Sequence, residues 1–212
     1  QRQMCIRDRD WGELNGETLC FLYREDQVAA TRWYVDRVLE SFRNAEYKNL
    51  DLAGFYWVDE DTAYNGDLSL SVSEYIHSKN LLFYWIPYWK AVGYEKWREL
   101  GFDMAYLQPN HFFEENIPDS RLEEACKESE KNGMAIEMEF DSRALSDYEP
   151  VSFRSRMKSY IDVFKDNGVF SDLPIAYYSG SRAIYEMYKS EDERDKEIMD
   201  ELCELIVERH KK

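Results

Sequence analysis

Five short apolar or aromatic runs, spaced more widely than hairpin strands, constrain the fold of this chain most. They are LDLAGFYWV (50–58), LLFYWIP (81–87), MAYLQPN (104–110), MAIEMEF (134–140) and PIAYYSG (174–180), and successive runs start between 23 and 40 residues apart. Near-continuous apolar runs are typical of parallel strands that are covered on both faces. Because the spacing is that of repeated βα units, we predict an α/β fold with a parallel sheet.

Helical patterns fill the segments between these runs. Helices are predicted over residues 27–47, 68–79, 93–100, 119–132 and 153–167, with a last one formed by SEDERDKEIMDELCELIVERHKK at the C-terminus. The helix-to-strand turns are predicted at Asn80, Gly101, Gly133 and Gly168, the residue types that end helices. Asp119 or Ser120 is placed to cap the helix that starts near Arg121.

Alternating strands and helices leave two architectures, a doubly wound sheet and a (β/α)₈ barrel. No GxGxxG or GxxxxGK[ST] pattern follows the first run, which argues against the nucleotide-binding version of the doubly wound sheet. A barrel needs eight units and about 250 residues. Five units in 212 residues therefore predict either an open five-stranded sheet or an incomplete (β/α)₈ TIM barrel whose first three strands are missing.

The N-terminal residues require separate treatment. MCIRD (4–8) back-translates to a sequence that resembles a transposon-end sequencing adapter. We therefore interpret residues 1–9 as an adapter-derived scar and residues 10–212 as a single partial barrel domain. On this interpretation the gene starts further upstream, so the lack of a visible signal peptide leaves the compartment open.

The composition of the chain limits the classes of binding partner that we expect. The formal net charge of −16 would repel nucleic-acid phosphates and anionic lipids, and no run is long enough to span a membrane. Neutral ligands such as carbohydrates remain. Four cysteines without a CxxC pair and three scattered histidines argue against a disulfide framework and a zinc site. No GxSxG elbow is present. We predict neither a metal nor a cofactor.

Several long motifs resemble one bacterial family. RWYVDRVLESFRNAEYKNLDLAGFYWV, LLFYWIPYWKAVGYEKWRELGFDMAYLQPNHFF, IPDSRLEEAC and MAIEMEFD occur in the order seen in domain of unknown function family four-eight-five-five. The resemblance extends over about residues 10–210. It implies a barrel similar to those of glycoside hydrolases, with further strands ahead of this segment, and no established activity.

Counting the strands of a complete barrel indicates two candidate catalytic carboxylates. If three strands are missing, residues 50–58 form strand four and residues 134–140 form strand seven, whose carboxyl ends carry Glu60 and Glu139. In the largest clan of barrel glycosidases, which this family's barrel resembles, these ends carry the acid/base and the nucleophile. Asp59, Asp61 and Glu137 are near enough to exchange roles with them. The alternative for residues 59–61 is a solvated loop that caps the next helix.

Aromatic and amide side chains recur at the ends of the predicted strands. Sugar rings pack on aromatic faces, and amides orient hydroxyl groups. The candidate substrate-binding residues are Trp57, Asp59, Trp85, Tyr88, Gln108, Asn110, His111, Glu137, Tyr177 and Tyr178. About half of the aromatic residues are expected to be ordinary core, and Pro109-Asn110 could equally form a plain turn.

These observations lead to one functional hypothesis and two alternatives. The first is a carbohydrate-active, glycoside hydrolase-like barrel with Glu60 as acid/base and Glu139 as nucleophile. The second is a non-catalytic glycan-binding or cell-surface module. The third is that this segment is inactive alone, because a barrel without three strands exposes sheet edges and is expected to aggregate.

Overall fold

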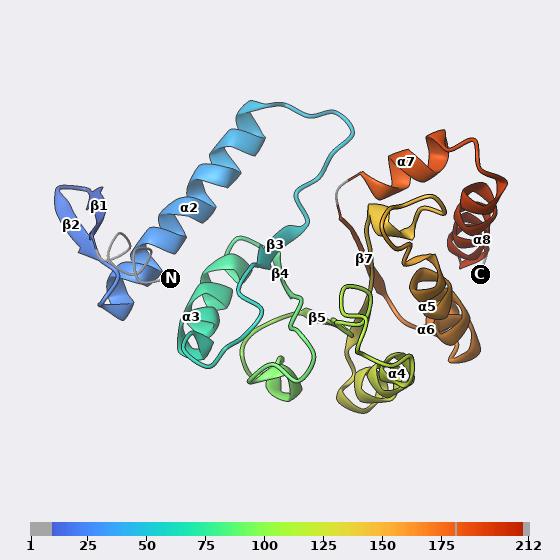
Figure 1. Cartoon of the computed structure of the whole chain (residues 1–212). Coiled ribbons are helices and arrows are strands. Elements are labelled where there is room, and N and C mark those ends of the chain that lie inside the picture. The colour runs from blue at the N-terminus through green and yellow to red at the C-terminus, as the bar shows by residue number, and fades with distance from the viewer. Residues whose placement is uncertain (1–9, 181, 210–212) are drawn as a thin grey trace. The chain divides into compact units, whose positions relative to one another are not determined.

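A computed structural model describes residues 10–180 and 182–209. Residues 1–9, interpreted above as an adapter scar, lie outside the described residues. The chain divides into two compact units, the first comprising residues 1–85 and 96–103, the second residues 86–95 and 104–212. Figure 1 shows the elements of both units, coloured along the chain. In neither described range does any helix have the length and apolar character to cross a membrane.

The five predicted strands are confirmed. They are β3 (Gly54–Trp57), β4 (Leu82–Trp85), β5 (Met104–Leu107), β6 (Ala135–Phe140) and β7 (Ile175–Ser179). In the first unit β3 and β4 are parallel, and Trp57 lies opposite Trp85. In the second unit β5, β6 and β7 are parallel in that order, with Leu107 opposite Ile136. The predicted α/β fold with parallel strands is therefore confirmed.

The first unit begins with a hairpin that the apolar runs did not predict. Strands β1 (Asp10–Leu14) and β2 (Glu17–Cys20) are antiparallel, and the turn between them has φ of 54° at Asn15 and 85° at Gly16. Two positive φ angles give the tight turn that matches strand twist, and Asn-Gly favours them. Helix α2 (Arg24–Asn44) follows the hairpin, as Figure 1 shows in blue.

Aromatic side chains form the core of the first unit behind β3 and β4. The Phe83 ring stacks on Phe102 at 4.7 Å between centroids, and Trp85 stacks on the same ring at 5.0 Å. Trp57 meets Phe83 edge-on at 5.8 Å. Helix α3 (Gly66–His77) covers these strands with its buried apolar face. The aromatic runs that predicted the strands therefore serve mainly to fill this core.

The predicted turn residues have the backbone conformation for which they were chosen. Asn80, Gly101, Gly133 and Gly168 have φ of 59°, 90°, 58° and 71°, and Gly133 is the left-handed C-cap of helix α4 (Ser120–Asn132). The predicted helix over 93–100 was too long, since only a 3₁₀ turn, η1 (Tyr94–Lys96), forms there. Tyr94 and Trp97 are both buried at a spacing of three residues, which suits a 3₁₀ turn.

Helices of the second unit bury amphipathic faces. Helix α5 (Arg154–Asp166) buries Met157, Tyr160, Ile161 and Phe164, the spacing of one helical face. The short helices α6 (Val169–Asp172) and α7 (Ala183–Lys189) were not predicted, whereas the C-terminal helix α8 (Glu193–Arg209) was. Buried Asp195 of α8 accepts hydrogen bonds from the Ser146 backbone N–H at 2.9 Å and from the Ser190 hydroxyl at 2.7 Å, fixing the loop after β6.

Candidate functional site

Two glutamates lie within strand β6, where every residue is buried. Glu137 is 5% exposed and Glu139 is 2% exposed, and strand alternation puts both on one face. In the parallel pairing with β7, Glu139 lies beside Tyr178 and Glu137 beside Ala176. Burying a carboxylate costs free energy unless hydrogen bonds compensate. The partners of Glu139 therefore decide what this site can do.

Two donors converge on one oxygen of Glu139. The Tyr160 hydroxyl, from helix α5, donates to Oε2 at 2.6 Å, and the His111 backbone N–H approaches the same oxygen at 3.4 Å. Hydrogen bonds of this kind stabilise the ionised form of a carboxylate. Burial, together with the nearby Glu139 charge, raises the pKa of Tyr160 well above 10, so Tyr160 remains a donor. The sequence analysis did not select Tyr160.

The His111 side chain is wholly buried and bonded to a carboxylate. Its Nε2 lies 2.7 Å from Asp119 Oδ1, and the Ser159 hydroxyl donates to Asp119 Oδ2 at 2.8 Å. Burial lowers the pKa of His111, although the bond to Asp119 opposes that shift. A neutral ring that donates from Nε2 leaves Nδ1 as an acceptor, and Nδ1 has no hydrogen-bond partner among the described residues.

Asp119 corrects the capping prediction. It occupies the N-cap position of α4 but makes no side-chain cap hydrogen bond, because His111 and Ser159 take its oxygens. Burial alone would raise the pKa of Asp119, but the bonds from Ser159 and His111 outweigh it and lower the pKa. A residue predicted to start a helix therefore joins α5 to the segment that follows β5.

Arg156 of α5 holds the same segment through its backbone. It donates to the carbonyl oxygens of His111, of Phe112 at 3.2 Å, of Glu114 at 2.9 Å and of Ile117 at 3.0 Å. These bonds fix the backbone that presents the His111 N–H to Glu139. Arg156 was also not selected from the sequence.

The amide side chains predicted to orient a ligand instead hold backbone. Gln108 donates to the Ile86 carbonyl at 2.8 Å, and the Asn110 amide oxygen accepts from the Trp89 N–H at 2.6 Å. Asn110 has φ of 49°, so the turn interpretation of Pro109-Asn110 describes its backbone well. Neighbouring Tyr88 remains 38% exposed.

The two predicted tyrosines of β7 point to opposite faces of the strand. Tyr178 is 51% exposed and its ring meets Phe113 edge-on at 5.8 Å. Tyr177 is on the Met138 face in register, and burial raises its pKa while Arg209 of α8 opposes the shift. Only Tyr178 therefore shares the face of Glu139.

In the first unit, the residues predicted around strand β3 lie in an exposed loop. Glu60 and Asp59 are exposed. Asp59 accepts from the Asn65 side chain and, at 3.4 Å, from the Asp61 N–H, while Asp61 accepts from the Ala63 N–H at 2.7 Å. This arrangement matches the solvated loop weighed as the alternative for residues 59–61. The role of Glu60 stays a prediction.

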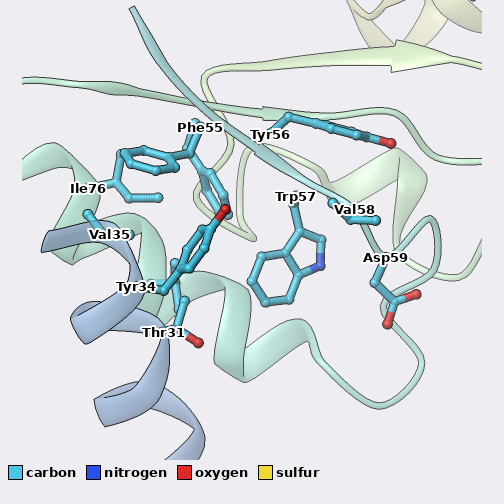
Figure 2. A pocket seen from close by; sticks show the side chains of 11 residues that line it. Thr31, Tyr34, Val35, Phe55, Tyr56, Trp57, Val58, Asp59 and Ile76 are labelled. Atoms are coloured by element: carbon cyan, nitrogen blue, oxygen red, sulfur yellow. The ribbon is translucent and has the colours of Figure 1, made fainter. Parts of the chain in front are cut away.

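The predicted aromatic residues Trp57 and Trp85 lie on the helix-facing side of their strands. Trp85 is fully buried and its indole N–H donates to the Asp59 carbonyl at 2.8 Å. Trp57 lines a groove with a volume of about 240 Å³, and its indole nitrogen has no hydrogen-bond partner among the described residues. In Figure 2, Tyr34 of α2 and Phe55 lie on the same side as Trp57, whereas Tyr56 points away.

No group of three or more His, Cys, Asp or Glu residues that could hold a metal ion occurs within residues 10–180 and 182–209. In the second unit, strand β6 places two buried carboxylates, Glu137 and Glu139, on one face, and the exposed Tyr178 lies beside Glu139.

Comparisons with known proteins agree with the fold. A crystal structure described as a "putative alpha-L-fucosidase" from Bacteroides thetaiotaomicron superposes with a TM-score of 0.53 at 17% sequence identity, covering 85% of this chain. The chain spans 61% of the length of that protein. No curated protein matches the sequence. The sequence pattern of the family described as Domain of unknown function (DUF4855) matches residues 3–204, so the chain belongs to that family.

Proposed function

We propose that this chain forms five βα units of a carbohydrate-active (β/α)₈ barrel, and that Glu139 is the nucleophile of a retaining glycoside hydrolase. The observation that carries the proposal is the buried Glu139 carboxylate with two donors on Oε2 at the carboxyl end of a parallel strand. Active sites of such barrels lie at that end of the strands. The structural neighbour, described as a fucosidase, supports the same class of activity.

The chemistry assigned to Glu139 follows from its surroundings. A retaining mechanism needs one carboxylate that is ionised and aimed, and one carboxylic acid that protonates the leaving group. The Tyr160 hydroxyl and His111 N–H stabilise the ionised Glu139, and burial of both groups keeps their geometry fixed. Arg156 and Asp119 act as positioning residues, because they hold the backbone and ring of His111. The acid/base predicted from the sequence is Glu60, which lies in the exposed loop after β3 of the first unit.

The alternative of a glycan-binding module also has an observation in its favour. The carboxylates of Asp59 and Asp61 are engaged in hydrogen bonds within their own loop. The exposed tyrosines Tyr56, Tyr88 and Tyr178 retain aromatic surface for sugar rings. Such a module would bind glycans without turning them over.

The test uses aryl glycosides with good and poor leaving groups, α-L-fucosides among them. Glu139→Gln should abolish turnover of every substrate, because even a good leaving group does not compensate for the loss of the nucleophile. Glu60→Gln should slow poor leaving groups by about 10² to 10⁴ and good ones far less, since good leaving groups need no proton. Glu124→Gln, an exposed glutamate on α4, is the matched control and should leave rates unchanged. Turnover that survives Glu139→Gln would refute the assignment, and glycan binding without turnover would support the alternative.

A further inference from the structure

A surface groove lies where strand β7 leads into helix α7. Residues from β7, α7 and α8 line it, namely Ser179, Arg182, Ile184, Tyr185, Tyr188 and Met199, around a volume of about 500 Å³. Ser179 ends β7, one residue after Tyr178, which lies beside Glu139 in the sheet register. The groove therefore belongs to the second unit and lies at the carboxyl end of β7, where Ser179 is on the opposite face of the strand from Tyr178.

Two cations, Arg182 in the lining and Lys189 next to it, contact the tyrosine rings of this groove. The Arg182 guanidinium lies 4.8 Å from the Tyr185 ring centroid, and Lys189 Nζ lies 5.2 Å from that of Tyr188. Lys189 is also 6.0 Å from Tyr185. Neither cation forms an ion pair within the part of the chain that the structure describes, although the chain carries a net charge of −16. These cation–π contacts restrict the two side chains, so less conformational entropy is lost when they bind an anion.

The tyrosines add a second kind of recognition. Tyr185 is 51% exposed and Tyr188 is 70% exposed, with Ile184 and Met199 beside them. Rings with this exposure offer apolar faces to sugar C–H groups and phenol hydroxyls to sugar hydroxyl groups. Glu186 is the one acidic residue of α7, so Arg182 and Lys189 leave the segment 182–189 with a net positive charge, whereas residues 190–197 carry five acidic and two basic residues. A ligand with apolar faces, hydroxyl groups and a negative charge fits these features.

We propose that this groove is a subsite for an acidic saccharide, with Arg182 and Lys189 binding its carboxylate or sulfate groups and Tyr185 and Tyr188 contacting its sugar rings. The proposal rests on the proposed function, because it names the substrate class for the site at Glu139. It revises the earlier expectation of a neutral carbohydrate, because Arg182 and Lys189 contact the tyrosine rings of the groove.

The experiment measures binding calorimetrically on the Glu139→Gln variant, so that turnover does not interfere. The probes are an oligogalacturonate, a sulfated galactose oligomer and a neutral galactose oligomer of equal length. We expect an acidic oligomer to bind at least about tenfold more tightly than the neutral one, and Arg182→Gln with Lys189→Gln to remove that preference. The control with the same charge change is Lys127→Gln with Lys165→Gln, on α4 and α5.

Each outcome decides the proposal separately from the catalytic assignment. Tighter binding of the oligogalacturonate would indicate a carboxylate ligand, and tighter binding of the sulfated oligomer a sulfate ligand. Equal binding of acidic and neutral oligomers, no binding of either, or equal losses in test and control variants would overturn the subsite. Because all four substituted cations are on the surface, thermal unfolding should confirm that both double variants fold. Tyr188→Leu, which removes a ring without changing charge, should weaken every bound oligomer. Acidic binding by the Glu139→Gln variant, together with turnover that this substitution leaves unchanged, would keep the subsite and refute the assignment of Glu139.

Discussion

Replacing Tyr160 by phenylalanine should destabilise the protein strongly for a change of one oxygen atom. The substitution keeps the buried ring, which packs on His111 and Phe164, and removes only the hydroxyl that donates to Glu139 at 2.6 Å. Hydrogen bonds to charged groups contribute about 1.5 to 3 kcal/mol, and no cavity term of note is added. For a chain of this size, that corresponds to a fall in Tm of about 3 to 12 °C.

The assay is urea unfolding followed by circular dichroism, with Tyr188→Phe as control. Tyr188 is 70% exposed, so its hydroxyl should contribute within about 0.5 kcal/mol. A second readout is alkaline pH. Because the pKa of Tyr160 is raised in the folded protein, its contribution is complete below about pH 10 and declines as pH rises above it. Tyr160→Phe should remove that part of the decline. A Tyr160→Phe change as small as the control's would refute the reasoning that Glu139 is ionised and depends on this donor.

The remaining predictions concern the stability of the protein at low pH, one glycine in a turn and one buried thiol. Burial lowers the pKa of His111, so its contribution to stability is present above about pH 6.5 and is lost as pH falls below that value. In acid-unfolding curves, His111→Gln should therefore show a smaller loss of stability below about pH 6.5. Gly101→Ala should destabilise by about 1 to 3 kcal/mol, because its φ is 90° and a Cβ would lie 2.2 Å from the Ser73 hydroxyl. Gly16→Ala has a similar φ of 85° and no atom within 4 Å, so calorimetry of the two variants separates the clash from backbone strain. Burial raises the pKa of Cys126 to about 12, so its thiol should react with a disulfide reagent at pH 8 only once urea has unfolded the chain.

Local chemistry explains what the sequence predicted well. Apolar runs such as residues 134–140 specify buried parallel strands wherever they occur, and Gly133 before that run supplies the left-handed C-cap that ends α4. Asn15-Gly16 carried an equally local signal for the first hairpin. The flanking residues, DWGEL and ETLC, are too polar to form an apolar run, so apolar runs alone do not predict this hairpin.

The candidate site was less predictable because its bonds join distant segments. Tyr160 and Glu139 are 21 residues apart, and Arg156 reaches a carbonyl 45 residues away. In the sequence, Tyr160 is indistinguishable from any aromatic residue on the buried face of a helix. Its hydroxyl was the available signal, since a buried phenol needs a partner. Asp119 shows the same limit, because its spacing predicts a cap whereas the fold brings His111 and Ser159 to its oxygens.

The burial of Glu139 argues for function more than for stability. An apolar residue at this position of β6 would avoid the cost of desolvating a charge, and such replacements of buried ionic groups are often neutral or stabilising. The chain instead gives this carboxylate two donors, the hydroxyl of a wholly buried tyrosine and the His111 backbone N–H, and Arg156 holds the His111 segment through four carbonyl oxygens. Local rules of core composition are broken mainly where chemistry requires it. A buried carboxylate that accepts hydrogen bonds from Tyr160 and His111 at the carboxyl end of a parallel strand is therefore the feature on which the proposed function rests.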